Sequence, residues 1–391
     1  MPPKEITPKL LSWASELDEQ TLAQACRTAR LPIVEGHVAL MPDAHLGIGA
    51  TVGSVIPTRD AIMPAAVGVD IGCGVIAVET DVRREQLPDD LIPMLRDIER
   101  RIPAGVGHGH DGRSSASKRW FTEHDPKRWR RHAFTPKQKQ RAIEQFGTLG
   151  AGNHHLEICI DERDIVWPEL HSGSRGIGNQ LATMHIEIAR QLADQRHLEL
   201  EDRDLAYFRE GTTAFDDYVA DMLWAQDYAQ ANRDQMMDVL LDLLFTTVGS
   251  GTEVKRINCH HNYSARERHG NRELWITRKG AIRARAGDEG VIPGSMATGT
   301  YVVRGKGSAA SYDSSAHGAG RRYSRRQAKK RFSVAQLEEH MAGKAWNRDR
   351  AQDLLDEIPD AYKDVESVMD DQRDLVEVEH VLRQVLNYKG S

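Results

Sequence analysis

The residues that could do chemistry in this chain lie in short glycine-rich segments, and the clearest segment is 68–74. Its sequence, Gly-Val-Asp-Ile-Gly-Cys-Gly, places the Asp70 carboxylate three residues before the Cys73 thiol. Glycine permits backbone conformations that other residues avoid, so such a turn can direct both side chains at one point. Thiolate and carboxylate are both ligands for divalent metals. The alternative is a tight turn between buried strands, with Cys73 as a small core residue.

Histidines gather in five further segments that have the character of turns or strand ends. They are His45, the pair His154 and His155, His171, the pair His260 and His261, and His317. Each histidine alone is explained by a solvated turn or a satisfied core position. Together they indicate a site assembled from several strand ends. The chain has no HExxH motif and no CxxC pair, which excludes the common zinc motifs. The mixed donors suit a divalent transition metal without naming it.

His317 differs from the other histidines because small residues surround it. Ala316, Gly318 and Gly320 would let the backbone close around a bulky anion, and Arg321 could pair with a phosphate. A neutral imidazole can also attack phosphorus and form a covalent intermediate. A metal ligand and a general base are the alternative roles for this histidine.

Two basic tracts indicate a nucleic acid partner. The first is residues 127–131 (Lys-Arg-Trp-Arg-Arg), and the second runs from Arg321 through 329–331. An aromatic residue within a cationic run suits phosphate contact combined with base stacking, although such runs are often solvated surfaces. Because the second tract begins four residues after His317, an anionic polymer is favoured as substrate.

The elements that must position these residues alternate between strands and helices along the whole chain. This pattern predicts one mixed α/β (α+β) domain, residues 1–391, with sheets flanked by helices. Residues 104–142, which are basic and poor in aliphatic side chains, are expected to form an irregular surface insertion. We expect helices at 18–29, 89–101, 179–195, 215–248 and 370–386, and after a capping box at Ser333 and Gln336. Strands are expected at 38–41, 53–56, 75–78, 156–160, 165–170, 273–277 and 300–304.

Composition places limits on the class of protein. Of 391 residues, 40% are hydrophobic and 28% charged, as in soluble globular proteins. No stretch has the roughly 18 apolar residues of a membrane span, and the segment after Met1 lacks the apolar core of a signal peptide. The four cysteines lie far apart, which argues against disulfides and favours a cytoplasmic location. The net charge of −6 argues against a protein coated in nucleic acid.

From about Lys9 onward, the chain resembles the RtcB family of RNA-splicing ligases, and most closely its bacterial branch. Seven motifs in family order carry the resemblance, and they are spread over most of the sequence. They are 41–47 (MPDAHLG), 68–74 (GVDIGCG), 150–154 (GAGNH), 171–176 (HSGSRG), 261–262 (HN), 293–296 (PGSM) and 317–321 (HGAGR). Residues 104–142 follow the family poorly.

The resemblance implies a single mixed α/β domain and a GTP- and Mn²⁺-dependent ligase with two metal ions. Such an enzyme joins an RNA 3′-phosphate or 2′,3′-cyclic phosphate end to a 5′-hydroxyl end through a guanylylated histidine and an RNA end activated by GMP. His317 stands at the nucleophile position, and Asp43 corresponds to a catalytic carboxylate close to the metals. The implied metal ligands are Asp70, Cys73 (bridging), His154, His171 and His261.

The resemblance also implies contacts to substrates. Positions implied to contact GMP are Asn153, Glu157, His261, Asn262, Pro293, Gly294, Ser295, Met296, His317, Gly318, Ala319, Gly320, Tyr362 and Lys389. Candidates for RNA phosphate contact are Arg175, Arg321, Arg325, Arg326 and Lys329. We expect a monomer that an archease-type factor could assist, with no membrane partner. The alternative function is a metal-dependent phosphodiesterase that opens cyclic phosphate ends without ligation.

Overall fold

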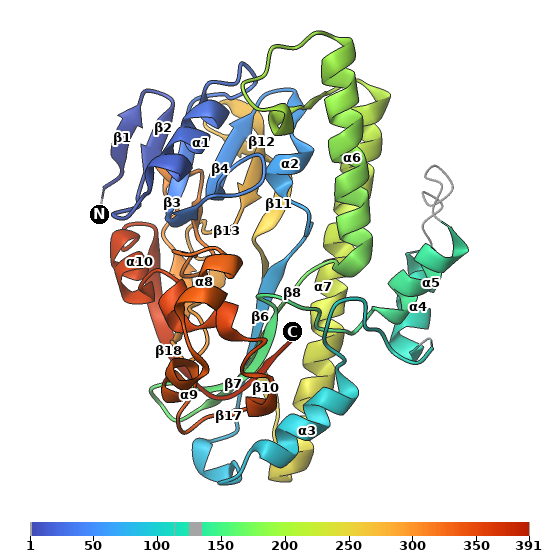
Figure 1. Ribbon diagram of the computed structural model, residues 1–391, viewed down its shortest axis with the longest axis vertical. Coiled ribbons are helices and arrows are strands. Elements are labelled where there is room, and N and C mark those ends of the chain that lie inside the picture. Colours follow the sequence, from blue (N-terminus) through green and yellow to red (C-terminus); the bar gives the residue numbers. More distant parts are fainter. Residues whose placement is uncertain (1, 113, 125–134, 391) are drawn as a thin grey trace.

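The computed structural model describes residues 2–112, 114–124 and 135–390, and two large sheets form its centre (Figure 1). The first sheet has the order β1 (Lys4–Thr7), β2 (Leu10–Ser12), β3 (Val38–His45), β4 (Val52–Thr58), β12 (Arg272–Lys279), β11 (Asn262–His269). The second has the order β10 (Glu253–His260), β6 (Gly74–Thr80), β8 (Val166–Ser172), β7 (His155–Ile160), β18 (Val376–Lys389), β15 (Thr300–Gly305), β14 (Glu289–Pro293), with β17 (Ala345–Trp346) also paired to β18. Two small sheets pair β13 (Ala281–Arg283) with β16 (Ser314–Ala316) and β5 (Ala61–Ile62) with β9 (Phe208–Arg209).

Two long helices, α6 (Arg175–Gln195) and α7 (Thr213–Val248), run side by side along one side of the molecule (Figure 1). Helix α7 contacts β6, β8 and β10. Met236 and Leu240 of α7 pack with Ile76, Leu156 and Leu170 of the second sheet in the largest buried cluster. Removing this apolar surface from water is the main force that holds the helix on the sheet. The helices expected at 179–195 and 215–248 are confirmed.

The other expected elements agree with the structure in most places. Residues 18–29 form α1 (Glu19–Ala29), which begins where the Asp18 side chain accepts hydrogen bonds from Gln20 and Thr21. Residues 89–101 form α3 (Ile92–Arg101), and Ser333 caps α9 (Val334–His340). All seven expected strands lie within β3, β4, β6, β7, β8, β12 and β15, apart from a residue at one end. Shorter helices are α2 (Pro64–Val67), α8 (Arg325–Arg331), α10 (Val365–Asp371) and the 3₁₀ turns Arg84–Gln86, Arg203–Leu205, Ala309–Ser311, Arg348–Arg350, Leu355–Glu357 and Pro359–Ala361.

The helix expected at 370–386 is wrong. Helix α10 ends at Asp371, and the following residues form β18, which inserts between β7 and β15. The apolar spacing there is compatible with a helix. However, β7 and β15 offer backbone hydrogen bonds on both sides of this segment, and this pairing overrides its local propensity.

Residues 104–142 are less irregular than expected. They contain α4 (Ser115–Glu123) and most of α5 (Pro136–Glu144), which contact each other and lie at the outer side of α6 and α7 (Figure 1). Trp120 is buried against Phe146, Trp224 and Tyr228. The aromatic anchor explains why this basic segment folds. Its tract 127–131 lies outside the described residues.

Candidate metal centre and histidine site

Four adjacent strands bring chemistry-bearing residues to one end of the second sheet. Antiparallel pairing places Gly74 of β6 opposite both Ser172 of β8 and His260 of β10, and His171 opposite His155 of β7. Because neighbouring strands alternate in direction, the start of β6 and β7 meets the end of β8 and β10. The residues at or beside these ends are Cys73, His171, His154 and His261, and Asp70 lies in the loop that leads to Cys73.

The polar atoms of these five side chains converge. The Cys73 Sγ lies 3.2 Å from Nε2 of His171 and 3.4 Å from Nε2 of His154. The Nε2 atoms of His171 and His261 are 2.9 Å apart, and Oδ2 of Asp70 is 3.0 Å from Nε2 of His154. Cys73 and the three histidines are buried. The structure thus brings together all five residues that the resemblance implies as metal ligands.

The donor set fits a transition metal. Two buried imidazole nitrogens, of His171 and His261, face one another. Only one of them can carry a proton and donate it to the other. The Nε2 atoms of His171 and His261 lie 2.9 Å apart, close to the Cys73 thiol. Buried polar groups are normally satisfied, and a cation between the thiol, the Asp70 carboxylate and these Nε2 atoms would use the lone pairs that now face one another. Mixed S, N and O donors are suitable ligands for Mn²⁺, Zn²⁺ or related ions.

The electrostatics of the cluster also suit a cation. Burial, together with the nearby His261, lowers the pKa of His171 well below its ordinary value. Burial likewise lowers the pKa of His154 and of His261. The imidazoles are therefore neutral, which is the form that ligates metals. Burial and the Asp70 carboxylate raise the pKa of Cys73, so binding of a metal would replace the thiol proton.

A buried arginine that sequence reasoning missed joins the segments that carry the ligands. Arg233 of α7 is fully buried, and its Nη1 donates to the carbonyls of Gly72 (2.8 Å) and Ser172 (3.1 Å). Its Nε donates to Asn258 Oδ1 (2.8 Å), and Nη2 lies 3.2 Å from Nδ1 of His260. Gly72 immediately precedes Cys73, Ser172 follows His171, and His260 precedes His261. In the described part of the chain, no carboxylate forms an ion pair with this guanidinium.

We expect Arg233→Lys to weaken metal binding by about tenfold to a hundredfold, as outer-shell changes do. The reason is that an ammonium cannot reach the carbonyls of Gly72 and Ser172 and the Asn258 side chain at once, so the three segments lose their common partner. Cobalt titration followed by absorbance would measure the affinity. Arg278→Lys is the matched control, because Arg278 is equally buried but pairs with Glu267. A similar loss of affinity in both variants would contradict a specific role for Arg233.

His317 lies beside the ligand cluster and forms a pair with Asp43. The two ring centroids of His317 and His261 are 4.6 Å apart. The His317 Nδ1 lies 2.5 Å from Oδ2 of Asp43, which is fully buried and also accepts the His317 backbone N–H at 3.2 Å. Gly320, at a φ of 75°, lies so close to the Asp43 carbonyl that a Cβ would approach it to 2.2 Å. The aspartate holds a proton on Nδ1, which leaves the Nε2 lone pair available.

One pocket of about 310 Å³ connects the two groups. Asp70, Cys73, His171, His261 and His317 line it, together with most of the positions implied to contact GMP. These are Asn153, Glu157, Asn262, Pro293, Gly294, Ser295, Gly318, Ala319, Gly320, Tyr362 and Lys389. Met296 does not line the pocket but packs in a neighbouring buried cluster.

The cationic residues expected to contact RNA lie in different places relative to the pocket. Arg321 and Arg325 line the pocket, whereas Arg326 and Lys329 do not. Arg326 is exposed on α8, and Lys329 pairs with Asp356 at 3.3 Å. Arg175, at the start of α6, lies 3.3 Å from Nδ1 of His154 and so belongs to the metal side of the site.

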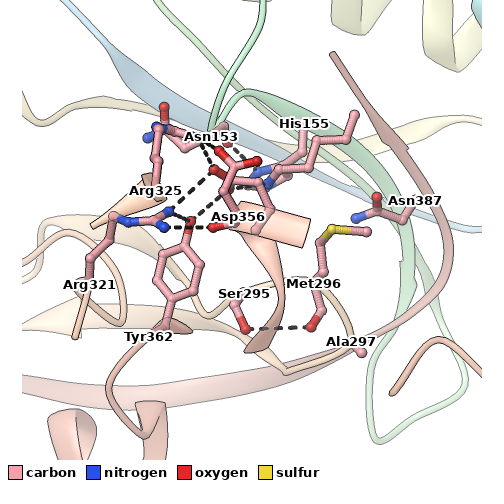
Figure 2. A network of polar contacts seen from close by, with 12 residues as sticks. Asn153, His155, Ser295, Met296, Ala297, Arg321, Arg325, Asp356, Tyr362 and Asn387 are labelled. Atoms are coloured by element: carbon pink, nitrogen blue, oxygen red, sulfur yellow. Dashed lines mark hydrogen bonds and ion pairs between the residues drawn. The ribbon is translucent and has the colours of Figure 1, made fainter. Parts of the chain in front are cut away.

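Glu357 is a second residue that sequence reasoning missed. It is 2% exposed, and its carboxylate contacts Arg321 (3.3 Å), Arg325, Tyr362 (2.6 Å) and Lys389 (3.0 Å). Figure 2 shows Arg321, Arg325 and Tyr362 directed toward one another beside Asp356. Burial opposes ionisation, but Lys389 and the two arginines lower the pKa of Glu357 to about 2. Arg321, Arg325 and Lys389 place three positive charges near one pocket. The need for a carboxylate that balances them was the signal that could have indicated Glu357.

A second buried cluster lies on the strands next to the pocket. Nε2 of His155 lies 3.1 Å from Glu169, and Asn387 donates to Glu157 at 2.6 Å. The ligand atoms of His155, Glu157 and Glu169 all lie within 4.8 Å of one another. Burial raises the pKa of Glu157 to about 7, so this carboxyl can donate as well as accept a hydrogen bond to a ligand in the pocket.

Neutral imidazoles, a thiol and a carboxylate that converge beside an Asp-oriented histidine are typical of a metal-dependent enzyme. Comparisons with known proteins name the family. The family model described as tRNA-splicing ligase RtcB matches residues 24–390. RNA-splicing ligase RtcB of Escherichia coli (strain K12) is 44% identical over 382 residues, which cover 94% of this chain and 93% of that protein.

More distant relatives match over similar lengths. The tRNA-splicing ligase RtcB of Nanoarchaeum equitans is 30% identical over 421 residues, covering 90% of this chain and 87% of the relative. RNA-splicing ligase RtcB of Mycobacterium tuberculosis is 28% identical, covering 89% and 95%. The chain therefore belongs to the RtcB family of RNA-splicing ligases, and it is an RNA ligase. Among the described residues, no helix is long and apolar enough to cross a membrane.

Proposed function

We propose that this protein is a GTP- and Mn²⁺-dependent ligase that joins RNA 3′-phosphate or 2′,3′-cyclic phosphate ends to 5′-hydroxyl ends. The observation that carries the proposal is the His317–Asp43 pair in the wall of the pocket that also contains the Cys73 cluster. A nucleophilic imidazole and a candidate metal centre in one pocket are what nucleotidyl transfer to a histidine requires.

Asp43 gives His317 the required tautomer. By accepting the Nδ1–H, it directs the Nε2 lone pair at the α-phosphorus of GTP. A bond forms between Nε2 and phosphorus as the bond to the pyrophosphate oxygen breaks, and the proton stays on Nδ1, hydrogen-bonded to Asp43. The product is a histidine–GMP phosphoramidate, which retains enough energy to transfer GMP onward.

Asp70, Cys73, His154, His171 and His261 would hold the two manganese ions. Metal ions at this position neutralise phosphate charge and polarise the phosphorus that is attacked. On the other side of the pocket, Asn153, Glu157, Ser295, Tyr362 and Lys389 would contact the guanylate. Glu357 orients the last two of these residues and supports them from behind the pocket.

The later steps follow from the same pocket. The RNA 3′-phosphate attacks the histidine-bound phosphorus, which forms a pyrophosphate link and frees His317. The 5′-hydroxyl then attacks the RNA phosphorus, and GMP leaves. A cyclic phosphate is first hydrolysed to the 3′-phosphate. Our proposal includes a single catalytic domain that acts as a cytoplasmic monomer, with an archease-type protein as a possible assistant.

The test is incubation with GTP labelled at the α-phosphate over a range of Mn²⁺ concentrations. We expect an acid-labile, base-stable label on the protein, and joining of a 3′-phosphate strand to a 5′-hydroxyl strand. If the metal-loaded protein opens cyclic phosphate ends but forms no adduct and joins no strands, the phosphodiesterase alternative is correct instead.

A further inference from the structure

Two aliphatic side chains lie exposed at the pocket that contains His317. Ile48 is 63% exposed and Val69 is 36% exposed, and both line the pocket together with Cys73 and His317. We call Ile48 and Val69 the aliphatic rim. A single exposed aliphatic residue is common on a protein surface. Two of them beside a reactive centre need a reason.

The backbone of the rim at Ile48 is held firmly from beneath. Gln24 of α1 is buried, and its side-chain amide donates to the carbonyls of Gly47 (2.7 Å) and Gly49 (2.9 Å). The Gly47 N–H in turn donates to the Gln24 side chain at 3.0 Å. The buried Lys279 ammonium donates to the Ile48 carbonyl. A buried amide and a buried ammonium thus fix a loop whose central side chain points into water.

Val69 is fixed by the loop that carries the proposed metal ligands. The carbonyl of its neighbour Asp70 accepts hydrogen bonds from Cys73 N (3.1 Å) and from the Asn262 side chain (3.4 Å). Gly68, at a φ of 94°, has Cε of Lys279 at 3.9 Å from its Cβ position, so the two parts of the rim approach the same lysine. The rim is therefore a preformed apolar surface, and its exposed area adds nothing to folding stability.

We propose that the aliphatic rim receives the terminal base of the 5′-hydroxyl RNA strand, an inference that rests on the proposed function. The two RNA ends differ chemically. The 3′ end carries a phosphate, to which the metal ions held by the proposed ligands would offer opposite charge. The terminal nucleoside of the 5′ end has an uncharged hydroxyl, so contacts to its base and sugar are what can orient the attacking oxygen locally. An apolar surface that lines this pocket can cover the face of any base and remove its apolar area from water.

The decisive experiment isolates the sealing step. The activated strand, RNA with a 3′-pp-5′-G end, is supplied ready-made, and the 5′-hydroxyl strand is titrated with wild type and with Ile48→Ala. We expect the apparent KM for that strand to rise by about tenfold in the variant, because three side-chain carbons that would be buried against the base are lost. A 5′-hydroxyl strand without a terminal base should show the same loss in wild type, and little further loss in Ile48→Ala.

Controls separate this role from others. Guanylylation of His317 by GTP needs no RNA, so its rate should be unchanged in Ile48→Ala. Val254→Ala is the matched control, because Val254 is 60% exposed on β10 but does not line the pocket. Equal losses on intact and base-free strands, or a comparable loss in guanylylation, would overturn the rim proposal. A wild type that forms no histidine adduct would instead overturn the proposed function, and this is visible before RNA is added.

Discussion

Replacement of His317 by asparagine should abolish the labelled protein adduct, with a loss of more than about a thousandfold in guanylylation rate. Asparagine can still donate a hydrogen bond to Asp43, so the pocket wall keeps its shape, but an amide nitrogen has no lone pair available to attack phosphorus. Metal binding should change by less than about threefold, because the five converging ligands are intact. The adduct is measured on denaturing gels, and the metal by cobalt absorbance.

The matched control for this experiment is His340→Asn. His340 also pairs with an aspartate, Asp360, at 3.0 Å, but it lies on the exposed helix α9. This variant should form the adduct at the rate of wild type. Retention of the adduct in His317→Asn would show that another residue is the nucleophile, and a loss of adduct in both variants would show that the assay reports general damage.

Cys73→Ala should lose tight metal binding and guanylylation together. Its Sγ lies close to Nε2 of both His154 and His171. Removal of the thiol therefore takes away the sulfur ligand at the centre of the proposed metal site. We expect the affinity to fall by at least about a hundredfold, beyond the effect of outer-shell changes. The cobalt-loaded protein should also lose the near-ultraviolet charge-transfer band of a thiolate ligand. That band reports ligation independently of activity.

Cys26→Ala provides the comparison, because Cys26 is a free, half-buried cysteine of α1 outside the pocket. It should keep the affinity, the band and the adduct. If Cys73→Ala keeps full metal affinity, a thiolate ligand is excluded, and Asp70 with the histidines must be sufficient.

Much of the site can be predicted from sequence because its residues lie at the ends of apolar segments. Cys73 precedes one such segment and His171 closes another, and adjacent antiparallel strands necessarily bring these ends together. The long helix α7 is equally readable, since its apolar spacing runs to Gly249, which adopts a φ of 85°. Strand β18 could not be predicted from the local sequence, because its conformation depends on pairing with β7 and β15, which are distant in sequence.

Residues that position other residues, rather than contact a ligand themselves, could not be recognised from the local sequence. Arg233 lies within a helix, and only the tertiary structure shows that it joins three strand ends. Glu357 likewise acquires its cationic partners from positions 32 to 36 residues before it and 32 residues after it. Arg321 and Arg325 looked like free phosphate ligands from their basic tract, yet both already form ion pairs with this carboxylate.

The place of β18 in the second sheet has a consequence for synthesis on the ribosome. All five proposed metal ligands precede residue 262, and their strands β10, β6, β8 and β7 are contiguous in the sheet. His317, Tyr362 and Lys389 follow later, and β18 pairs with β7 only after residues 376–389 have been translated. Until then, the nascent chain presents β7 as an open edge, which favours contact with other chains. The metal-binding half of the pocket can therefore form first, and its nucleotide-binding half is completed when β18 has emerged.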